Sequence, residues 1–540
     1  MMSLLSLRLS SQIQLELTAS FGAVTGLQHG YLCGAAFEEL EPLSAKTFED
    51  KLIQAIESDT LSVFLAKLNG FFSLVYYYRG QLFLCTDKLR SRPLFYTMQQ
   101  GTICVSDSVE RLTVLMPEVL QYQNLSSEEF RHTGYVTGGN TLLASVQQVE
   151  SCSYLMFYAG RLEQRTYFAL PALGAGTRSD AGQEPWQGLD TVLRNCIARL
   201  IQYASGRQIV LPLSGGYDSR ALALYLKHSG YNKVVSFSFG RCGSPELAKG
   251  EQVAKALGLP WVAVTYSRKE WRAFAQSEEF KRFLGFAHQY ASVPAVQVML
   301  ALHKLRLTGL ITPNAVFVPG HTADFLSGGH RPVVSAESSM EDCLALALQI
   351  TVRSHYALSP NALSEPLNAK VLTQLNQLAT QGQYADAATL CEAWNFKERQ
   401  AKFIVNSNRY YDFYRYDWWM PLWDNEFIYY WQQVSSAARV AKHHWICFID
   451  RQMSRLGTGV QITGNADVRT SKWRARFYRY SEYWTDLNLL YALVPFKRWL
   501  FWRYGWSKKS GTLFGWLSDT LLPSPQKTES QNKRTTDGSP

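Results

Sequence analysis

The chain has 540 residues, of which 46% are hydrophobic and 13% aromatic, and its formal net charge is +10. This length predicts two or more domains, and this composition excludes a disordered chain. No apolar run reaches the roughly 18 residues of a membrane-spanning helix. The positive charge fits an anionic partner such as a nucleotide, a nucleic acid or an acidic lipid, but it also fits an ordinary basic protein.

The N-terminal region, up to about residue 170, is predicted to be rich in β-strands. The first residues, MMSLLSLRLSSQIQLEL, have no basic segment before their apolar residues, so they predict a strand and not a signal peptide. Residues 71–87, FFSLVYYYRGQLFLCTD, alternate around Arg79-Gly80 as the two strands of a β-hairpin do.

Cysteine usage indicates the compartment. The chain has nine cysteines, which are scattered and include no C-x-x-C pair. An odd, scattered set predicts reduced thiols, with neither a disulfide framework nor a zinc site. We therefore expect a cytoplasmic protein.

A change of pattern marks a second domain. Residues 174–188 are polar and rich in glycine, which predicts a linker. After it, predicted strands at 207–213, 233–239 and 261–265 alternate with helices, one of which covers Glu251–Leu257 and stops at Gly258. Strands that alternate with helices are typical of a parallel sheet. Residues 340–450 are predicted to be mostly helical, and the polar tail 523–540 to be disordered.

The stretch LPLSGGYDSR at 211–220 joins the first of these strands to the helix that follows. Backbone N–H groups at adjacent glycines beside a helix N-terminus form a cradle for an anion, and ligands of parallel sheets bind at this edge. A carboxylate such as that of Asp218 would be repelled by a phosphate group on its own. It is well suited, however, to hold a magnesium ion that is bound to the phosphate. The alternative is a plain helix-capping turn.

Five segments of the chain carry a resemblance to a known family. The turn resembles the pyrophosphate loop of the N-type ATP pyrophosphatases, and the other segments resemble motifs of the asparagine synthetase family in the family's order. The segments are SGGYDS at 214–219, FSFG at 237–240, PGHTADFLSGGH at 319–330, WWMPLWDNEFI at 418–428 and the glutaminase-like LNGFFSLVYYYRGQLFLCTDKLRSRPLFY at 68–96. The PLWD variant resembles members from bacterial surface-polysaccharide gene clusters.

This resemblance implies a two-domain fold. Residues 1–173 would form an α+β sandwich of the Ntn-hydrolase type, as a degenerate glutaminase-like domain. Residues 189–490 would form an α/β parallel-sheet, HUP-like ATP pyrophosphatase domain with a helical C-terminal part. A basic, aromatic segment at 491–522 has the composition of an amphipathic helix on an anionic membrane, although it also fits a partner groove or a helix packed on the domain. A homodimer is also compatible with the sequence.

The resemblance also implies roles for individual residues. ATP would be the cosubstrate and Mg²⁺ the metal, with Asp218 and Asp324 as the metal-binding carboxylates. The nucleotide-binding residues would be Leu213, Ser214, Gly215, Gly216, Asp218, Ser219, Phe239, Pro319 and Gly320. Lys472, with Arg474 in reserve, would stabilise charge during the reaction. The alternatives are a loop role for Asp324 and a solvated basic face for Lys472.

Departures from the family narrow the expected activity. The chain begins Met1-Met2-Ser3, has Cys33 as its first cysteine, and lacks the family's glutamine-binding segment. We therefore expect no glutamine hydrolysis, with ammonia or an amine as the nitrogen donor. His321 and Phe325 stand where the family has glutamates; His321 is a candidate base, or else a packing residue.

The predicted activity is an ATP-dependent, AMP-forming ligase that activates a carboxylate and converts it to an amide. The carboxylate could be aspartate, a sugar acid or a peptide that is cyclised in the manner of a lasso peptide. Sugar stacking on the aromatic residues 409–431 is one reading of that stretch, and a buried core is the preferred one. The alternatives are a nucleotide-binding scaffold and a tRNA-thiolating enzyme, although no nucleic-acid-binding module is evident.

Overall fold

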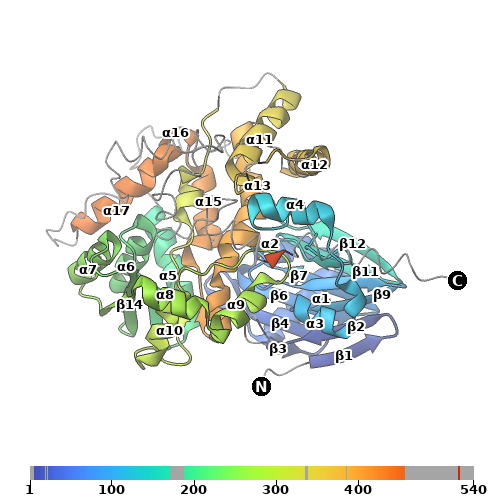
Figure 1. Ribbon diagram of the computed structural model, residues 1–540, viewed down its shortest axis with the longest axis horizontal. Coiled ribbons are helices and arrows are strands. Elements are labelled where there is room, and N and C mark those ends of the chain that lie inside the picture. The colour runs from blue at the N-terminus through green and yellow to red at the C-terminus, as the bar shows by residue number, and fades with distance from the viewer. Residues whose placement is uncertain are drawn as a thin grey trace.

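The computed structural model describes residues 5–455, apart from residues 19, 21, 23, 171–185, 187, 335–338, 360, 383 and 385, together with residues 521–522. Figure 1 shows the blue strands of the N-terminal region on one side of the molecule and the green strands and helices of the second region on the other. Several predictions fall on residues outside this description. They concern Lys472, the segments 491–520 and 523–540, and the predicted linker, of which only Trp186 and Gly188 are described.

The N-terminal region contains two sheets that lie face to face. One sheet has the strand order β1-β2-β9-β8-β10, and the other has the order β12-β11-β7-β6-β4-β3 with β5 paired to β4. The strands are β1 (Leu5–Ser10), β2 (Ile13–Leu17), β3 (Val24–Leu27), β4 (Gly30–Glu38), β5 (Glu41–Pro42), β6 (Asn69–Tyr78), β7 (Gln81–Thr86), β8 (Phe95–Gln99), β9 (Thr102–Ser106), β10 (Val146–Gln148), β11 (Ser153–Tyr158) and β12 (Arg161–Thr166).

Alternating side chains hold the two sheets together. Leu15 of β2, Leu84 of β7 and Val105 of β9 are fully buried in one cluster between the sheets. The outer faces are covered by helices: Phe48 and Leu52 of α1 pack on one sheet, and the helix α3 packs on the other. The helices here are α1 (Ala45–Glu57), α2 (Leu61–Lys67), α3 (Val109–Leu115), η1 (Pro117–Val119) and α4 (Asn124–Thr133).

The predicted hairpin is confirmed. Strands β6 and β7 pair antiparallel, and their last paired residues are Tyr78 and Gln81. Both turn residues have positive φ, 49° at Arg79 and 83° at Gly80. This geometry is that of the two-residue turns that match the twist of a hairpin.

The second region is built on a five-stranded parallel sheet with the order β15-β14-β13-β16-β17. Its strands are β13 (Ile209–Pro212), β14 (Val234–Gly240), β15 (Trp261–Thr265), β16 (Val316–Phe317) and β17 (Asp417–Trp418). The order reverses direction at β13, and the carboxyl ends of strands at such a point, here β13 and β16, are where open parallel sheets bind ligands.

Helices accompany this sheet and continue into a helical lobe. Beside the sheet lie α5 (Leu189–Ala204), α6 (Tyr217–His228), α7 (Pro245–Leu257), α8 (Arg268–Ala275), α9 (Glu278–His288) and α10 (Met299–Leu307). The later elements are η2 (Phe325–Gly329), α11 (Met340–His355), α12 (Glu365–Gly382), α13 (Ala387–Trp394), η3 (Asn395–Ile404), η4 (Val405–Asn408), α14 (Arg409–Phe413), η5 (Pro421–Trp423), α15 (Asn425–Gln433), α16 (Ser436–Arg439), η6 (Val440–Lys442) and α17 (His443–Arg455).

The predicted strands and helices are present with small shifts of their ends. The strand expected at 261–265 is β15 without change, and the helix expected to stop at Gly258 does so, because this residue takes a left-handed conformation at the C-cap. Pro212 ends β13, as its missing N–H requires, and the N–H of Leu213 still reaches Phe237. No helix among the described residues is both long and apolar enough to cross a membrane.

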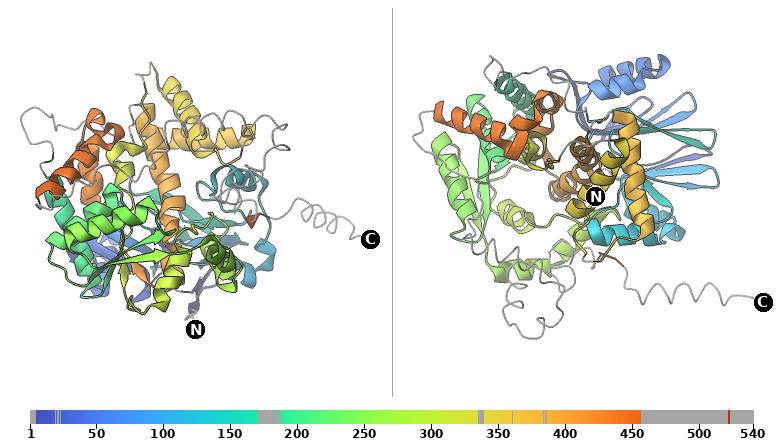
Figure 2. Two further views of the ribbon diagram at one scale, coloured as in Figure 1. Left: turned by 60° about the vertical axis from the view of Figure 1, so that its left-hand side comes forward. Right: turned by 90° about the horizontal axis from the view of Figure 1, so that it is seen from above.

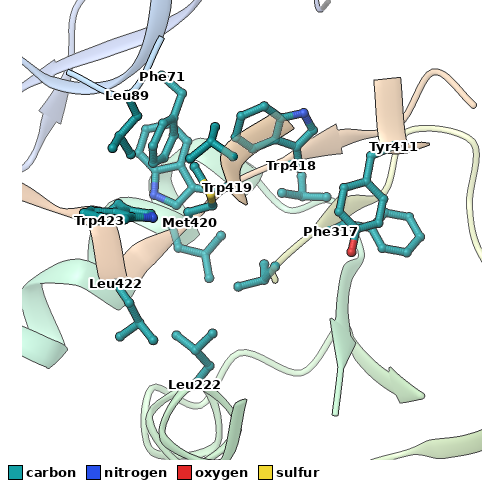
Figure 3. Packing of buried hydrophobic residues seen from close by; sticks show 14 of the residues in the cluster. Phe71, Leu89, Leu222, Phe317, Tyr411, Trp418, Trp419, Met420, Leu422 and Trp423 are labelled. Atoms are coloured by element: carbon teal, nitrogen blue, oxygen red, sulfur yellow. The ribbon is translucent and has the colours of Figure 1, made fainter. Parts of the chain in front are cut away.

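The aromatic stretch 409–431 is a buried core and not an exposed stacking surface. Trp418, Trp423 and Trp431 are at most 3% exposed. Figure 3 shows Trp418 and Trp419 beside Phe71 of the N-terminal region, and the ring centroids of Phe71 and Trp419 are 4.7 Å apart. In the right-hand view of Figure 2 the brown helices near the centre accordingly lie between the green elements and the blue strands.

A buried ion pair joins the two regions at this core. Arg92 of the N-terminal region donates to Asp412, with an Nη1–Oδ1 distance of 2.6 Å, and both side chains are at most 2% exposed. Trp418 donates to the same oxygen at 3.0 Å, and the Arg92 guanidinium lies 4.4 Å from its ring centroid. Arg409 forms an ion pair with the other oxygen of Asp412, with an Nε–Oδ2 distance of 3.2 Å.

We expect Asp412→Ala to destabilise the protein strongly, because it leaves two buried guanidinium groups without their carboxylate. A loss of about 3–5 kcal/mol is typical when one partner of a buried pair is removed. Urea unfolding, followed by tryptophan fluorescence, measures this loss. Glu278→Ala, which removes an exposed pair with Lys281, is the control and should leave the midpoint unchanged. Equal midpoints for the two variants would contradict the role assigned to Asp412.

Candidate active site

The loop between β13 and α6 is held in shape by its own serines. The hydroxyl of Ser219 accepts the N–H of Ser214 at 3.2 Å, and the hydroxyl of Ser214 accepts the N–H of Gly216 at 3.2 Å. No side chain among the described residues caps the N-terminus of α6. The first turn of this 12-residue helix therefore presents backbone N–H groups to a ligand, and its dipole favours an anion.

Two glycines let other segments approach this loop closely. A Cβ atom on Gly215 would lie 2.6 Å from the side chain of Lys249, so the stem of this lysine packs directly against the loop. A Cβ atom on Gly320 would lie 3.1 Å from the backbone nitrogen of Ser219. The segment after β16 thereby lies against the start of α6, as a site shared by both strands requires.

The carboxyl groups of Asp218 and Asp324 lie next to each other. The backbone N–H of Asp324 donates to Oδ2 of Asp218 at 3.1 Å, and the indole of Trp445 donates to Oδ1 at 2.9 Å. Burial and the neighbouring charge of Asp324 raise the pKa of Asp218. Two adjacent carboxylates of this kind repel each other unless a proton or a cation lies between them.

His330 supports Asp324 from the other side. Its Nε2 lies 3.3 Å from Oδ2 of Asp324. Burial alone would raise the pKa of Asp324, but the hydrogen bond and charge of His330 outweigh it, so the pKa is lowered. One carboxylate of the pair therefore stays ionised, while the other, Asp218, is the one that protonates more readily.

These two carboxylates fit a magnesium ion. Among the described residues no group of three or more His, Cys, Asp or Glu side chains gathers as a metal site. Magnesium, however, is commonly held by one or two protein carboxylates, and its other ligands are water and substrate phosphates. The open N-terminus of α6 beside Asp218 supplies the place for such phosphates.

His321 lies at the same edge of the sheet. Its Nδ1 is buried and has no hydrogen-bond partner within the described part of the chain. Burial lowers the pKa of His321 to about 4, so the ring is neutral at neutral pH. A neutral imidazole with an unpaired nitrogen can accept a proton or bond a ligand. Phe325, which replaces a second family glutamate, is buried and packs on Trp423 instead.

The remaining nucleotide residues of the prediction lie at the ends of three neighbouring strands. Phe239 is half-buried near the end of β14, and Pro319 follows β16. The side chain of Leu213 is 1% exposed within the core, so only its backbone faces the loop, where its carbonyl accepts Ser238 at 2.5 Å. If Leu213 contacts the nucleotide as predicted, the contact would use its backbone and not its side chain.

Lys442 is a cation near the carboxylates that the sequence analysis missed. Its charge acts on both Asp218 and Asp324, and its stem packs over Gly329, where a Cβ atom would lie 2.9 Å from Cδ of the lysine. No pattern in the sequence separates Lys442 from the other lysines. Only the packing of η6, which directly precedes the helix α17 that carries Trp445, brings it here.

The N-terminal region places Cys33 in β4 beside a group of buried charges. Burial raises the pKa of this thiol to about 12. A thiol with such a pKa is not a nucleophile at neutral pH, because the thiolate is the reactive form. All nine cysteines of the chain are free.

Comparison with known proteins characterises part of the chain. Residues 48–168 match the family model of a glutamine amidotransferase domain. The chain is also 28% identical over 188 residues to the tRNA-specific 2-thiouridylase MnmA of Shouchella clausii (strain KSM-K16), which covers 32% of this chain and 46% of that protein. The chain thus spans less than half the length of this curated relative. The N-terminal region is of the glutamine amidotransferase type.

Two solved structures are similar at low levels. The allosteric regulatory enzyme of purine biosynthesis is 10% identical, covers 55% of this chain and 56% of its own, and has a TM-score of 0.17. Glutamine phosphoribosylpyrophosphate amidotransferase from B. subtilis, complexed with ADP and GMP, is 13% identical, covers 55% and 63%, and has a TM-score of 0.18. TM-scores this low support no argument about the fold. The description of the fold therefore depends only on the strand order given above.

We expect Gly250→Ala to damage the site through packing. A Cβ atom at this position of α7 would lie 2.1 Å from Oγ of Ser238 and 2.7 Å from the carbonyl oxygen of Leu213. Overpacking of this kind costs about 1–3 kcal/mol, which thermal unfolding measures. Gly285→Ala on α9 is the matched control, because nothing lies within 4 Å of its added methyl group. A control that is unchanged or up to about 1 kcal/mol more stable is expected; equal losses would contradict the packing argument.

Proposed function

We propose that the chain is an ATP-dependent ligase that activates a carboxylate as an acyl-adenylate, releases pyrophosphate and forms an amide. The parallel-sheet region would be an ATP pyrophosphatase domain of the asparagine synthetase type. The acceptor is a carboxylate other than free aspartate in this proposal, because His321 and Phe325 replace the two glutamates of that type.

One observation supports this proposal above all others. Asp218 and Asp324 are 106 residues apart in the sequence, yet they meet at the carboxyl edge of the sheet beside an uncapped helix N-terminus. This arrangement suits a nucleotide triphosphate with its magnesium ion. The amidotransferase-type N-terminal region supports nitrogen-transfer chemistry in the same chain.

In the proposed mechanism the chain's own groups first position the nucleotide. The N–H groups at the start of α6, with the hydroxyls of Ser214 and Ser219, would hold the β and γ phosphates. Asp218 and Asp324 would hold Mg²⁺, which when bound neutralises charge on the phosphate oxygens. Trp445 and His330 orient these two carboxylates through the bonds described above.

The chemical steps then require a base and a cation. A carboxylate oxygen of the acceptor attacks the α-phosphorus, the bond to the bridging oxygen breaks, and pyrophosphate leaves. An amine nitrogen next attacks the acyl carbon, loses a proton and displaces AMP. Lys442 would stabilise the negative charge in these steps, in the role predicted for Lys472, and His321 would accept the proton.

The similarity to a tRNA-specific 2-thiouridylase favours a second candidate function, tRNA thiolation. Sulfur transfer needs an accessible thiol, and Cys242, in the loop after β14, is exposed. The amidotransferase-type region is not accounted for by this candidate, which is why we place it second. Release of pyrophosphate that needs tRNA and no small carboxylate would favour it.

We expect the purified protein to release pyrophosphate from Mg-ATP and ammonium only when a suitable carboxylate is added. Aspartate, uronic acids and a reaction without substrate form the panel. Asp218→Ala and Asp324→Ala should each lower the rate at least about 100-fold, because each removes a group that stabilises transferred charge. Lys442→Met should lower the rate while ATP binding persists.

Asp342→Ala is the matched control for these carboxylate variants, because this aspartate is exposed at the start of α11. It should keep the rate of the parent protein. Pyrophosphate release that survives in Asp218→Ala would contradict the assignment of the site. The absence of release with every carboxylate, although ATP binds, would favour a nucleotide-binding scaffold.

We expect ammonium, and not glutamine, to supply the nitrogen. Burial keeps the thiol of Cys33 in its neutral form. Arg92 is paired with Asp412 and is therefore not free to bind glutamine. Incubation with glutamine should therefore yield no glutamate, and Cys33→Ser should leave the ammonium-dependent rate unchanged. Glutamate release by the parent protein that is lost in Cys33→Ser would overturn this expectation.

A further inference from the structure

Three polar atoms without partners mark a second site at the junction of the N-terminal region and the helical lobe. They are the hydroxyl of Tyr135, Nδ1 of His355 and Nη1 of Arg399. Each atom is buried, and none makes a hydrogen bond within the described part of the chain. The side chain of Tyr135 is 1% exposed. Burial of a polar group without a partner costs free energy, so three such atoms together call for an explanation.

Packing contacts place the three side chains around η3 and the end of the helix that precedes it. The ring of Tyr135 lies 5.8 Å from that of Phe403, which is four residues from Arg399 on the π-helical segment η3. His355 stacks on Trp394, with centroids 5.3 Å apart and planes 18° apart, and Trp394 directly precedes η3. The charge of Arg399 acts on both Tyr135 and His355. Segments with π-helical geometry are frequent at functional sites.

The acidic groups in this neighbourhood already have partners. Glu129 bonds Lys370 at 2.6 Å, and Glu398 bonds Lys402 at 2.6 Å. Arg399 itself forms no ion pair with any described residue. The positive charge of Arg399 is therefore the one that remains to be balanced at this site.

The chemistry of the three atoms suits an oxyanion. A guanidinium N–H and a phenol O–H both donate, and a neutral imidazole donates from Nδ1 in one of its tautomers. Burial, with the neighbouring charges of Arg399 and His330, lowers the pKa of His355 to about 3, so this ring stays neutral. A carboxylate or a phosphate group would satisfy all three donors and balance Arg399.

The site is connected to the carboxylate pair through His330. His330 forms a pair with Asp324, and the next residue, Arg331, donates to Glu392 at 2.5 Å. Glu392 lies on α13 with Trp394, the residue on which His355 stacks. We propose that Tyr135, His355 and Arg399 bind an anionic group of the acceptor other than the carboxylate that is activated. The acceptor would then carry at least two anionic groups, the second a carboxylate or a phosphate. The anion site stands on its own contacts, whereas its link to the acceptor rests on the proposed function.

Anion binding by the purified full-length protein tests this site directly. The melting temperature is measured with potassium acetate or potassium phosphate, each at constant ionic strength adjusted with potassium chloride. Mg-α,β-methylene-ATP is present in excess, so that the loop at α6 is not the site measured. We expect one of the two anions to raise the melting temperature, and its identity separates a carboxylate group from a phosphate group.

Variants separate binding from structure. Arg399→Met should weaken the anion effect at least about tenfold, and Tyr135→Phe should weaken it less, since a charged donor contributes more. Without anion, Arg399→Met should melt no lower than the parent protein, because it removes a half-buried charge that has no ion pair among the described residues. Arg353→Met, which removes an exposed arginine of α11, is the matched control and should keep the parent response.

The outcomes distinguish this proposal from the proposed function. If neither anion raises the melting temperature of the parent protein, or if Arg399→Met responds as the parent does, the anion site is wrong, whatever the pyrophosphate assay gives. If the anion effect depends on Arg399 but no carboxylate supports pyrophosphate release, the site stands and the ligase assignment fails. With an active acceptor, Arg399→Met should raise KM at least about tenfold and change kcat less; an unchanged KM would overturn the link to the acceptor.

Discussion

The buried pair between Arg92 and Asp412 is the constraint on which the arrangement of the two regions depends. It lies in a core of tryptophan rings, and Trp418 of β17 donates to the same carboxylate. Because β17 pairs with β16, this pair fixes the edge of the parallel sheet against the sandwich. The segment that follows β16 carries Asp324. The sandwich therefore helps to position the carboxylate pair, although it contributes no residue to that pair.

This arrangement gives the N-terminal region a structural role. In addition to Arg92, Lys88 reaches across the boundary and donates to Asn425 at 2.7 Å. Both residues belong to the stretch 68–96, whose resemblance to a glutaminase domain first indicated an amidotransferase. In this chain both side chains are bonded to residues of the second region. These two contacts therefore help to hold the N-terminal region against the second region.

The sequence was most informative where local chemistry decides structure. Alternation around Arg79-Gly80 predicted the hairpin, and the glycines at 215 and 216 predicted a tight loop before a helix. The meeting of Asp218 with Asp324 followed only from the family resemblance, since strand order cannot be read from the residues alone. Lys442, Trp445 and the three atoms at Tyr135, His355 and Arg399 were not predicted, because each owes its place to helices that pack from distant parts of the chain.

The negative charge of the Asp218–Asp324 pair and the positive charge of Arg399 at the proposed anion site would have complementary effects on an acceptor. An acceptor that approaches Asp218 and Asp324 as a carboxylate is repelled by them, and a magnesium ion bound by the pair, as proposed, would offset only part of this repulsion. The charge of Lys442 acts on both carboxylates of the pair, and Nε2 of His330 lies 3.3 Å from Oδ2 of Asp324. The charge of Arg399 acts on His355 in the helical lobe. In the proposed reaction, the positive charges of Lys442 near the pair and of Arg399 in the helical lobe would attract an anionic acceptor. An acceptor with anionic groups at both ends would then lie in a fixed orientation, which is what attack on a single phosphorus atom requires.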